Sequence, residues 1–577
     1  MERFQRLFIE AELSPDIWTE LPDIMQKTGI QCTSGLRSPD TQTMVASTGT
    51  MTFSLRNDKG CSGGVSHYYT PGHFNCLQGW EVGKRVRLVI HWAGERWIIW
   101  IGRIMIGGIQ INADLYVPTV TVTARDYMEE LAVHELVLPK FTTNKKMNEV
   151  VPLIIEKMPI KPLNVRYDDT ATVFPTVFDT VWKKTRALEE INKLAKSELG
   201  YVYLRNEFNK PETLFMEGRN YRSTFTRAAI YGTMELDDPI ETEDHRVLET
   251  EGGEILYVQH GWYNGLGLPL ETEDRQIIQT EGGENIYLQS KWDNEWGEPN
   301  REVFANSARD ITLVNGLDYL NYIKITTHPR KVDESNVELF SLNSPLEIPA
   351  GVTVIYNAKF VDPDQKAERI TAMSTEAPVV STDYNLSSDK TIDSGNLNAY
   401  CVLTRTYGAD GFEDKITNNG TSTGYITKLK ARGRGVYIYQ AIGTVTKDDA
   451  DILEHGQVGW DLDCLYLDDP FVAKDYLYLL RTKTFKMGTD IVTYTYVANK
   501  NIYKMQAFLM LTIGDIIAVS ETDAGISNEY WIYGKDWVIG EGGITMVTYI
   551  LRPAELDIYK FWRLDESALD TETVLGV

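Results

Sequence analysis

The stretch Val120-Thr-Val-Thr-Ala-Arg-Asp-Tyr-Met-Glu-Glu-Leu131 changes its pattern halfway along. Its first half alternates small apolar residues with threonine, which is typical of a strand with one buried face. Asp126 then offers a side chain that can cap the first turn of a helix, so a short helix is expected over residues 126–132. The stretch predicts that a β-domain ends at about residue 125 and that a region of another kind begins there.

Residues 1–125, on the amino-terminal side of this boundary, contain further alternating runs. The runs cover residues 8–13, 50–55, 85–90, 97–101 and 119–124. Short strands joined by tight turns predict a small barrel or sandwich. Four tryptophans lie in or near strand-like runs, and core or interface packing is expected for them rather than stacking on sugars. They are Trp97, Trp100, Trp531 and Trp537.

Residues 126–235 mix helices with strands and predict a small α/β insert. Residues 144–158 favour a helix that contains Pro152, which would kink it. The clearest helix covers residues 185–199, with Thr185 as its cap and Gly200 in the left-handed position that stops it. Strands are expected over residues 201–204 and 213–217.

Residues 236–299 hold the one plain internal repeat. The segment at 240–259 recurs at 270–289, an offset of 30 residues, and each copy reads as strand, Glu-Gly-Gly turn, strand. We therefore expect two β-hairpins, which are too few for a solenoid. The repeat is rich in carboxylates, and the favoured interpretation is a solvated hairpin face. A calcium site and a glycosidase acid pair are the alternatives.

The remaining chain is also β-rich. Residues 300–480 show no strong helix, and residues 385–398 and 408–424 have the composition of loops. Residues 481–555 form a second alternating block, with strands expected within 511–519, 530–533 and 544–551. The sequence thus predicts a mainly β multidomain protein, and 577 residues correspond to roughly three to five domains.

The composition excludes several classes of protein. Lys and Arg number 57 against 82 Asp and Glu, a net charge of -25, which disfavours binding to nucleic-acid backbones. The five cysteines are sparse and odd in number, so no disulfide framework is expected. The amino terminus lacks the pattern of a signal peptide, and no run of about 18 apolar residues predicts a spanning helix. A soluble protein made in a reducing cytoplasm is expected.

Four residues form the sharpest metal candidate, namely Cys61, His67, His73 and Cys76. They are suitable zinc ligands. Their spacing, C-x5-H-x5-H-x2-C, fits no standard finger, so we favour a long loop with reduced, packed cysteines. No metal and no cofactor are predicted. The motifs G-x-S-x-G, H-E-x-x-H and G-x-x-x-x-G-K-[ST] are absent, so we do not expect an enzyme.

In chain order, these blocks resemble the minor tail proteins of long-tailed bacteriophages and, through them, the trimeric baseplate hub of contractile tails. The resemblance covers about half of the chain, and short segments in the barrel, the insert and the carboxyl terminus carry it. They are residues 49–57, 83–88, 100–104, 120–131, 185–203, 214–219, 513–519, 530–534 and 562–570. No single motif is specific, and the order and spacing are more telling. The Glu-Gly-Gly repeat and most of 300–480 depart from the family plan.

The resemblance implies two hub-type β-barrels, one at 1–125 and one at 481–555, with a closing segment at 556–577. Three chains would form a pseudo-sixfold ring that joins the tail tube to the distal tip. The protein would then be a homotrimer in the tail tip of a virion, assembled in the host cytoplasm. Its partners would be the distal tail protein, the tape measure and tip or fibre proteins, with a host-surface receptor as a further partner. An acidic lumen would let DNA pass without sticking.

Two other functions remain open at this point. The chain could be a tail-tip adhesin that binds a host-surface glycan or receptor, with the repeat and the elaboration at 300–480 carrying the binding. It could also be a cell-wall hydrolase, which the missing motifs disfavour. A buried carboxylate pair in a cleft would support the hydrolase.

Overall fold

The computed structural model is mainly β and contains several packed units, which confirms the predicted fold class. It describes residues 4, 6–25, 27–112, 118–137, 139, 141–181, 184–208, 210–224, 238–239, 257–258, 301–305, 308–362, 366–408, 410–485, 487–521 and 525–554. Apart from a short pairing of β15 (Asp238–Pro239) with β16 (Tyr257–Val258), the predicted repeat lies outside these residues. The predicted closing segment at 556–577 also lies outside them. No helix in the described part of the chain is long and apolar enough to cross a membrane.

The first barrel is built from seven strands within residues 1–125. They are β1 (Arg6–Ser14), β2 (Ile17–Leu21), β3 (Ile30–Gly35), β4 (Thr50–Arg56), β5 (Arg85–Trp92), β6 (Glu95–Asn112) and β7 (Thr119–Arg125). Every alternating run predicted here is a strand. The alternation has the expected cause, since Val120, Val122 and Ala124 on β7 are fully buried while the threonines between them are partly exposed.

The second barrel combines six strands from two distant parts of the sequence. They are β17 (Arg301–Ala305), β18 (Asp310–Asn315), β31 (Thr489–Val497), β32 (Ile516–Glu521), β33 (Ile526–Ile539) and β34 (Thr545–Pro553). Helix α7 (Ile502–Met510) connects β31 to β32. β17 pairs with β32 and β18 pairs with β31. Residues 301–315 thus belong to this barrel, and the boundary predicted at residue 300 is wrong for them.

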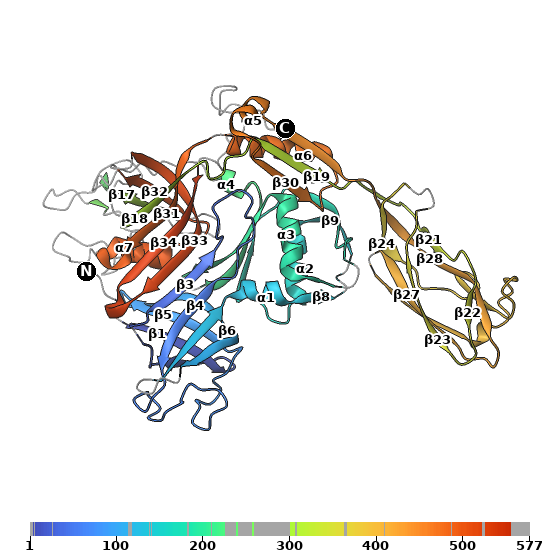
Figure 1. Ribbon diagram of the computed structural model, residues 1–577, viewed down its shortest axis with the longest axis horizontal. Coiled ribbons are helices and arrows are strands. Elements are labelled where there is room, and N and C mark those ends of the chain that lie inside the picture. The colour runs from blue at the N-terminus through green and yellow to red at the C-terminus, as the bar shows by residue number, and fades with distance from the viewer. Residues whose placement is uncertain are drawn as a thin grey trace, which may run out of the picture.

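The two barrels share one 13-stranded sheet, whose main path is β18-β31-β34-β33-β3-β4-β7-β6-β5-β1-β2. The order β18-β31-β34-β33 repeats as β3-β4-β7-β6, and each pair within the two runs is antiparallel. β5 pairs with the first half of β6, as β32 pairs with the first half of β33. The barrels differ at their margins, because β1 is antiparallel to β5 whereas β17 is parallel to β32. Figure 1 shows β3 and β33 side by side where the barrels meet.

The insert packs its helices against small sheets. Its helices are α1 (Tyr127–Val133), α2 (Met147–Lys157), α3 (Ala187–Glu198) and α4 (Tyr221–Thr224). Its strands are β8 (Glu135–Val137), β9 (Thr142–Lys146), β10 (Asn164–Tyr167), β11 (Val173–Val177), β12 (Lys184–Arg186), β13 (Tyr201–Glu207) and β14 (Lys210–Glu217). Asp126 accepts a hydrogen bond from the Met128 amide, so the predicted cap of α1 is confirmed. Pro152 lies inside α2 as expected.

Both predicted ends of the third helix are wrong in detail. The residue at the N-cap of α3 is Arg186, and the Thr185 hydroxyl instead donates to the Glu190 carboxylate. At the other end, Leu199 takes the left-handed conformation, with φ of 58°. Gly200 serves another purpose, because a Cβ there would lie 2.4 Å from the carbonyl oxygen of Glu217.

Residues 319–329 and 442–485 add a layer over the insert. This layer contains β19 (Tyr322–Thr327), β29 (Ile442–Lys447), β30 (Gly459–Cys464), α5 (Asp449–His455) and α6 (Pro470–Thr484). Tyr476 of α6 packs in the same core cluster as Leu194 of α3. Helix α6 contradicts the prediction that 300–480 has no strong helix. Asp469 caps it and Pro470 occupies its first turn, both favoured start signals.

The rest of the 300–480 region is an elongated sandwich that projects away from the barrels (Figure 1). Its strands are β20 (Arg330–Val332), β21 (Val337–Ser341), β22 (Leu346–Ile348), β23 (Thr353–Lys359), β24 (Arg369–Thr375), β25 (Tyr384–Ser387), β26 (Cys401–Tyr407), β27 (Gly411–Asn418) and β28 (Gly424–Ile438). The loop predicted over 408–424 is wrong, because β27 lies between β23 and β26. Phe412 and Ile416 on β27 are fully buried.

Candidate functional site at the barrel junction

The junction between the barrels is a six-residue antiparallel pairing of β3 with the second half of β33. It runs from Ile30 opposite Ile539 to Gly35 opposite Gly534. Gly35 has a φ of +94°, and a Cβ there would lie 2.4 Å from the carbonyl oxygen of Tyr533. Only glycine fits such a close backbone approach. The pairing continues past Gly35, since the Leu36 amide donates to the same Tyr533 oxygen at 2.8 Å.

Strand β33 belongs to both the second barrel and the junction. On one edge it pairs with β34 along most of its length. On the other edge its first half pairs with β32 and its second half pairs with β3. A bulge between Ile532 and Gly534 separates the halves. Such a bulge bends a strand and re-aims it, so one strand closes the barrel and also joins its neighbour.

A buried lysine fixes helix α7 to the junction. The Lys535 ammonium donates to the carbonyl oxygens of Phe508 and Leu511, each at 2.6 Å. These carbonyls lie at the end of α7, where helix carbonyls lack partners within the helix. Burial lowers the pKa of Lys535 to about 7, although the nearby Asp515 carboxylate acts in the opposite direction.

An ion pair connects the insert to the second barrel. Arg205 on β13 donates to Asp515 at 2.8 Å, and the two side chains are 2% and 0% exposed. The other oxygen of Asp515 accepts from the Thr512 amide at 2.7 Å. A buried pair of this kind costs desolvation, but leaving one partner alone costs more. The pair therefore holds the insert and the barrel in a fixed relation.

A second buried network lies around Tyr533, two residues from Lys535. The Arg552 guanidinium donates to the hydroxyls of Tyr533 at 2.6 Å and of Tyr201 at 2.7 Å. It also donates to the Thr41 hydroxyl at 3.1 Å. Arg222 donates to Tyr533 as well, at 2.8 Å. First barrel, insert and second barrel thus meet in one hydrogen-bonded cluster.

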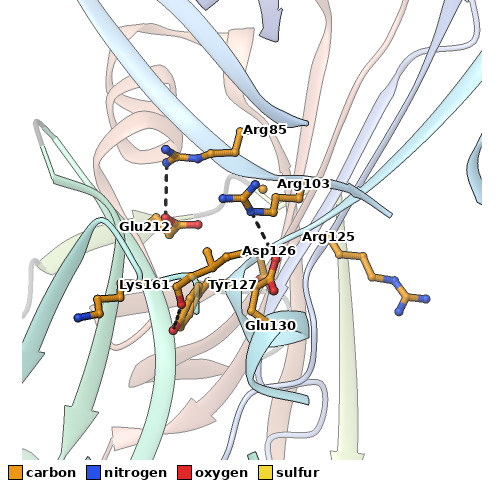
Figure 2. A pocket seen from close by; sticks show the side chains of 10 residues that line it. Arg85, Arg103, Arg125, Asp126, Tyr127, Glu130, Lys161 and Glu212 are labelled. Atoms are coloured by element: carbon orange, nitrogen blue, oxygen red, sulfur yellow. Dashed lines mark hydrogen bonds and ion pairs between the residues drawn. The ribbon is translucent and has the colours of Figure 1, made fainter. Parts of the chain in front are cut away.

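A small cavity lies where the first barrel meets the insert (Figure 2). Arg85 of β5 points toward Glu212 of β14 at 3.8 Å, and Arg103 of β6 points toward Glu130 of α1 at 3.4 Å. Burial raises the pKa of Glu212 to about 7, against the effect of Arg85. Burial also raises the pKa of Asp126 well above its usual range.

Asp126 and Glu212 are two buried carboxyls that line this cavity, so the hydrolase alternative is tested here. The cavity measures about 40 Å³, whereas ligand pockets measure about 300–1,000 Å³. Both groups also have structural partners, since Asp126 caps α1 and Glu212 accepts from the Leu163 amide. The geometry fits a joint that holds a few water molecules.

The structure does not bring the four candidate metal ligands into one site. The rings of His67 and His73 lie 4.6 Å apart. The Cys61 thiol instead donates to the Val65 carbonyl at 3.1 Å, and the Cys76 thiol lies against backbone carbonyls of its own loop. Across the described part of the chain, no group of three or more His, Cys, Asp or Glu residues could hold a metal ion. All five cysteines are free in the structure.

The tryptophan prediction is confirmed, because Trp97, Trp100, Trp531 and Trp537 are all buried. Sequence reasoning missed the charges at the junction. A signal existed for Lys535, which follows the apolar run 530–533 and precedes Trp537. A lysine at an inward position of a strand is rare unless it is paired. No local signal marks Arg205 or Asp515, since their contact joins residues far apart in sequence.

No protein-family model matches the chain, and no curated protein matches it. Solved structures resemble it at low identity. A tail protein from Neisseria meningitidis is 8% identical, with 96% of this chain and 99% of that chain covered and a TM-score of 0.43. The 43 kDa tail protein of prophage MuSo2 from Shewanella oneidensis is 9% identical, with 96% and 99% covered and a TM-score of 0.42.

A third similar structure is an Escherichia coli component of the type VI secretion system, described as similar to the T4 bacteriophage tail proteins gp27 and gp5. It is 7% identical, with 92% of this chain and 73% of that chain covered and a TM-score of 0.33. The solved structures that resemble this chain thus include tail proteins and a protein likened to phage tail proteins.

Proposed function

We propose that this chain is a structural protein of a bacteriophage tail tip and that its barrels build a hub ring between the tail tube and the distal tip. One observation carries the proposal: a four-strand order occurs twice in tandem within a single continuous sheet. The contact between the two barrels of one chain is head-to-tail, and the same kind of contact can be repeated between chains to form a ring. Three chains would supply six similar barrels.

The junction supports a structural role. Three of its buried charged groups, Lys535, Arg205 and Asp515, form hydrogen bonds with other parts of the same chain. These contacts hold two barrels and the insert rigidly, as a ring segment requires. The net charge of -25 disfavours retention of DNA on the surface of such a ring. We propose no catalytic activity.

The projecting sandwich favours a second role in host attachment. It extends away from the barrels and from the insert (Figure 1). Within it, Ile355 and Val402 are 57% and 51% exposed, and exposed apolar side chains are common at contact surfaces. The barrels would build the ring, and the sandwich would reach a host-surface glycan or receptor, or a neighbouring tail protein.

An antibody raised against the sandwich tests both roles on assembled tails. The proposal predicts that gold-labelled antibody binds at the distal end of the tail in electron micrographs. Label along the tube or on the head would contradict a tail-tip location. Pre-treatment with the same antibody should reduce adsorption to host cells if the sandwich makes the attachment, and unchanged adsorption by fully labelled tails would contradict that second role.

A further inference from the structure

The strand repeat leaves two strand edges without partners. β18 begins one four-strand unit as β3 begins the other, but β18 pairs only with β31 among the described residues. β6 ends its unit as β33 does. β5 covers its first half, and no strand in the described part of the chain pairs with the same edge of residues 109–112. Six strands, β31, β34, β33, β3, β4 and β7, lie between β18 and β6 in the sheet, so the two edges are far apart in one chain.

Exposure distinguishes these two edges from the joined pair. Leu313 on β18 is 41% exposed and Ile111 on β6 is 43% exposed. Their counterparts at the junction, Cys32 and Trp537, are 1% and 3% exposed. Residues 104–112 contain no charged side chain, and β18 contains only Asp310. Free strand edges usually carry charges or proline that block pairing.

The bulges allow β6 to be aligned with β33 residue by residue. Ala124 on β7 and Leu551 on β34 are the residues paired just before the bulge in β6 and in β33. We take Ala124 and Leu551 as equivalent positions and count residues backward along β7 and β34. Residues of β6 and β33 that pair with equivalent positions on these strands are then equivalent to each other. The resulting matches between β6 and β33 are Gly108 with Gly534, Ile109 with Lys535 and Ile111 with Trp537.

The same anchors align β18 with β3. Thr52 on β4 pairs with Thr123, and Thr493 on β31 pairs with Ile550. Thr123 and Ile550 each precede an anchor by one residue, so Thr52 and Thr493 are equivalent. Thr52 also pairs with Gln31, and Thr493 pairs with Thr312. β31 carries one extra residue at a bulge here, because Thr312 pairs with Thr493 and Leu313 pairs with Ile491. Counting along β3 and β18 themselves, with this extra residue assigned to β31, gives two further matches, Cys32 with Leu313 and Gly35 with Gly316.

The glycines confirm that the alignment is physically sensible. At the junction Gly35 lies opposite Gly534, where the two backbones meet too closely for side chains. The alignment places glycine at both equivalent positions, Gly316 and Gly108. Gly316 also shares the positive φ of Gly35, +69° against +94°. The glycine pair of the joint within the chain therefore occurs a second time, on its two free edges.

We infer that β18 of one copy pairs antiparallel with residues 108–112 of β6 in a second copy, in the register of β3 with β33. Leu313 then lies directly opposite Ile111, and two half-exposed apolar side chains become buried. The partner is another copy of this chain. The contact is head-to-tail, since it uses two different surfaces, and such a contact gives a ring when the rotation from one copy to the next closes. This inference rests on the proposed ring and names the strands that form it.

Disulfide cross-linking tests the register. In a background with Cys76 and Cys401 changed to serine, the double variant Leu313→Cys/Ile111→Cys should form a ladder of linked chains on oxidation. Mixing the two single variants should give linked dimers only, because each chain then offers one half of the contact. Thr312→Cys/Ile111→Cys is the matched control, because neighbouring residues on a strand point to opposite faces. It should link at least about tenfold less.

A charge on the edge provides a second readout that needs no disulfide geometry. Ile111→Lys should weaken the oligomer at least about tenfold, since a lysine would be buried opposite Leu313. Ile17→Lys, on the edge strand β2 at a residue 62% exposed, should leave it intact. If the Leu313→Cys/Ile111→Cys protein forms an oligomer of the mass expected for the ring but does not cross-link, this interface is wrong and the proposed ring is not contradicted. A protein that neither links nor associates at any concentration would contradict both.

Discussion

Replacing Asp515 with alanine should lower the free energy of unfolding by about 3–5 kcal/mol, the usual cost of removing one partner of a buried ion pair. Arg205 would lose its fully buried partner at 2.8 Å and keep only the partly exposed Glu207 at 2.9 Å. The Thr512 amide would lose its acceptor. The lost contacts join the insert to the second barrel, so both should become less stable together. Urea unfolding followed by tryptophan fluorescence measures the change.

Two further variants separate the effect of charge from the effect of truncation. Asp169→Ala removes an exposed carboxylate whose partner is Lys146 and should leave the unfolding midpoint unchanged. Arg205→Met/Asp515→Leu removes both charges and should be less harmful than Asp515→Ala alone. An Asp515→Ala protein as stable as the Asp169→Ala protein would show that the buried pair does not hold the insert in place.

Replacing Gly35 with alanine should cost about 2–5 kcal/mol, from left-handed strain together with overpacking. A Cβ would lie 2.4 Å from the Tyr533 oxygen and 2.9 Å from the Gly534 Cα, and both are backbone atoms that cannot rotate away. The strands β3 and β33 would have to separate at this end. The expected result is a lower thermal midpoint and faster proteolysis between the barrels.

Gly83→Ala is the matched control for this substitution. Gly83 also has a positive φ, +83°, but a Cβ there would meet no atom within 4 Å. Gly83→Ala should lower the free energy of unfolding by only about 1–2 kcal/mol, the cost of placing alanine in the left-handed conformation. Equal shifts for the two variants would mean that the close approach at Gly35 contributes nothing to the junction.

The sequence predicted the elements whose causes are local. The alternation at 119–124 and the cap at Asp126 each depend on neighbours in sequence, and both hold in the structure. Helix α6 also has a local cause, Asp469 followed by Pro470. The sequence analysis did not predict this helix, because the surrounding region is rich in tyrosine and β-branched residues, which favour strands.

The junction could not be predicted from local patterns. β17 and β18 join the second barrel through partners on β31 and β32, far along the chain. The contact of Arg205 with Asp515 is likewise set by tertiary packing. The doubled strand order becomes visible only when the pairing of strands is known, since the two barrels share no obvious sequence repeat.

The mass of the purified protein in solution, measured by light scattering over a range of concentrations, tests the central claim most directly. Two similar barrels per chain in a pseudo-sixfold ring predict a particle of three times 65.6 kDa. Two chains related by a twofold axis would use one surface twice instead of two different surfaces. A closed dimer, or a monomer at every concentration, would contradict the ring.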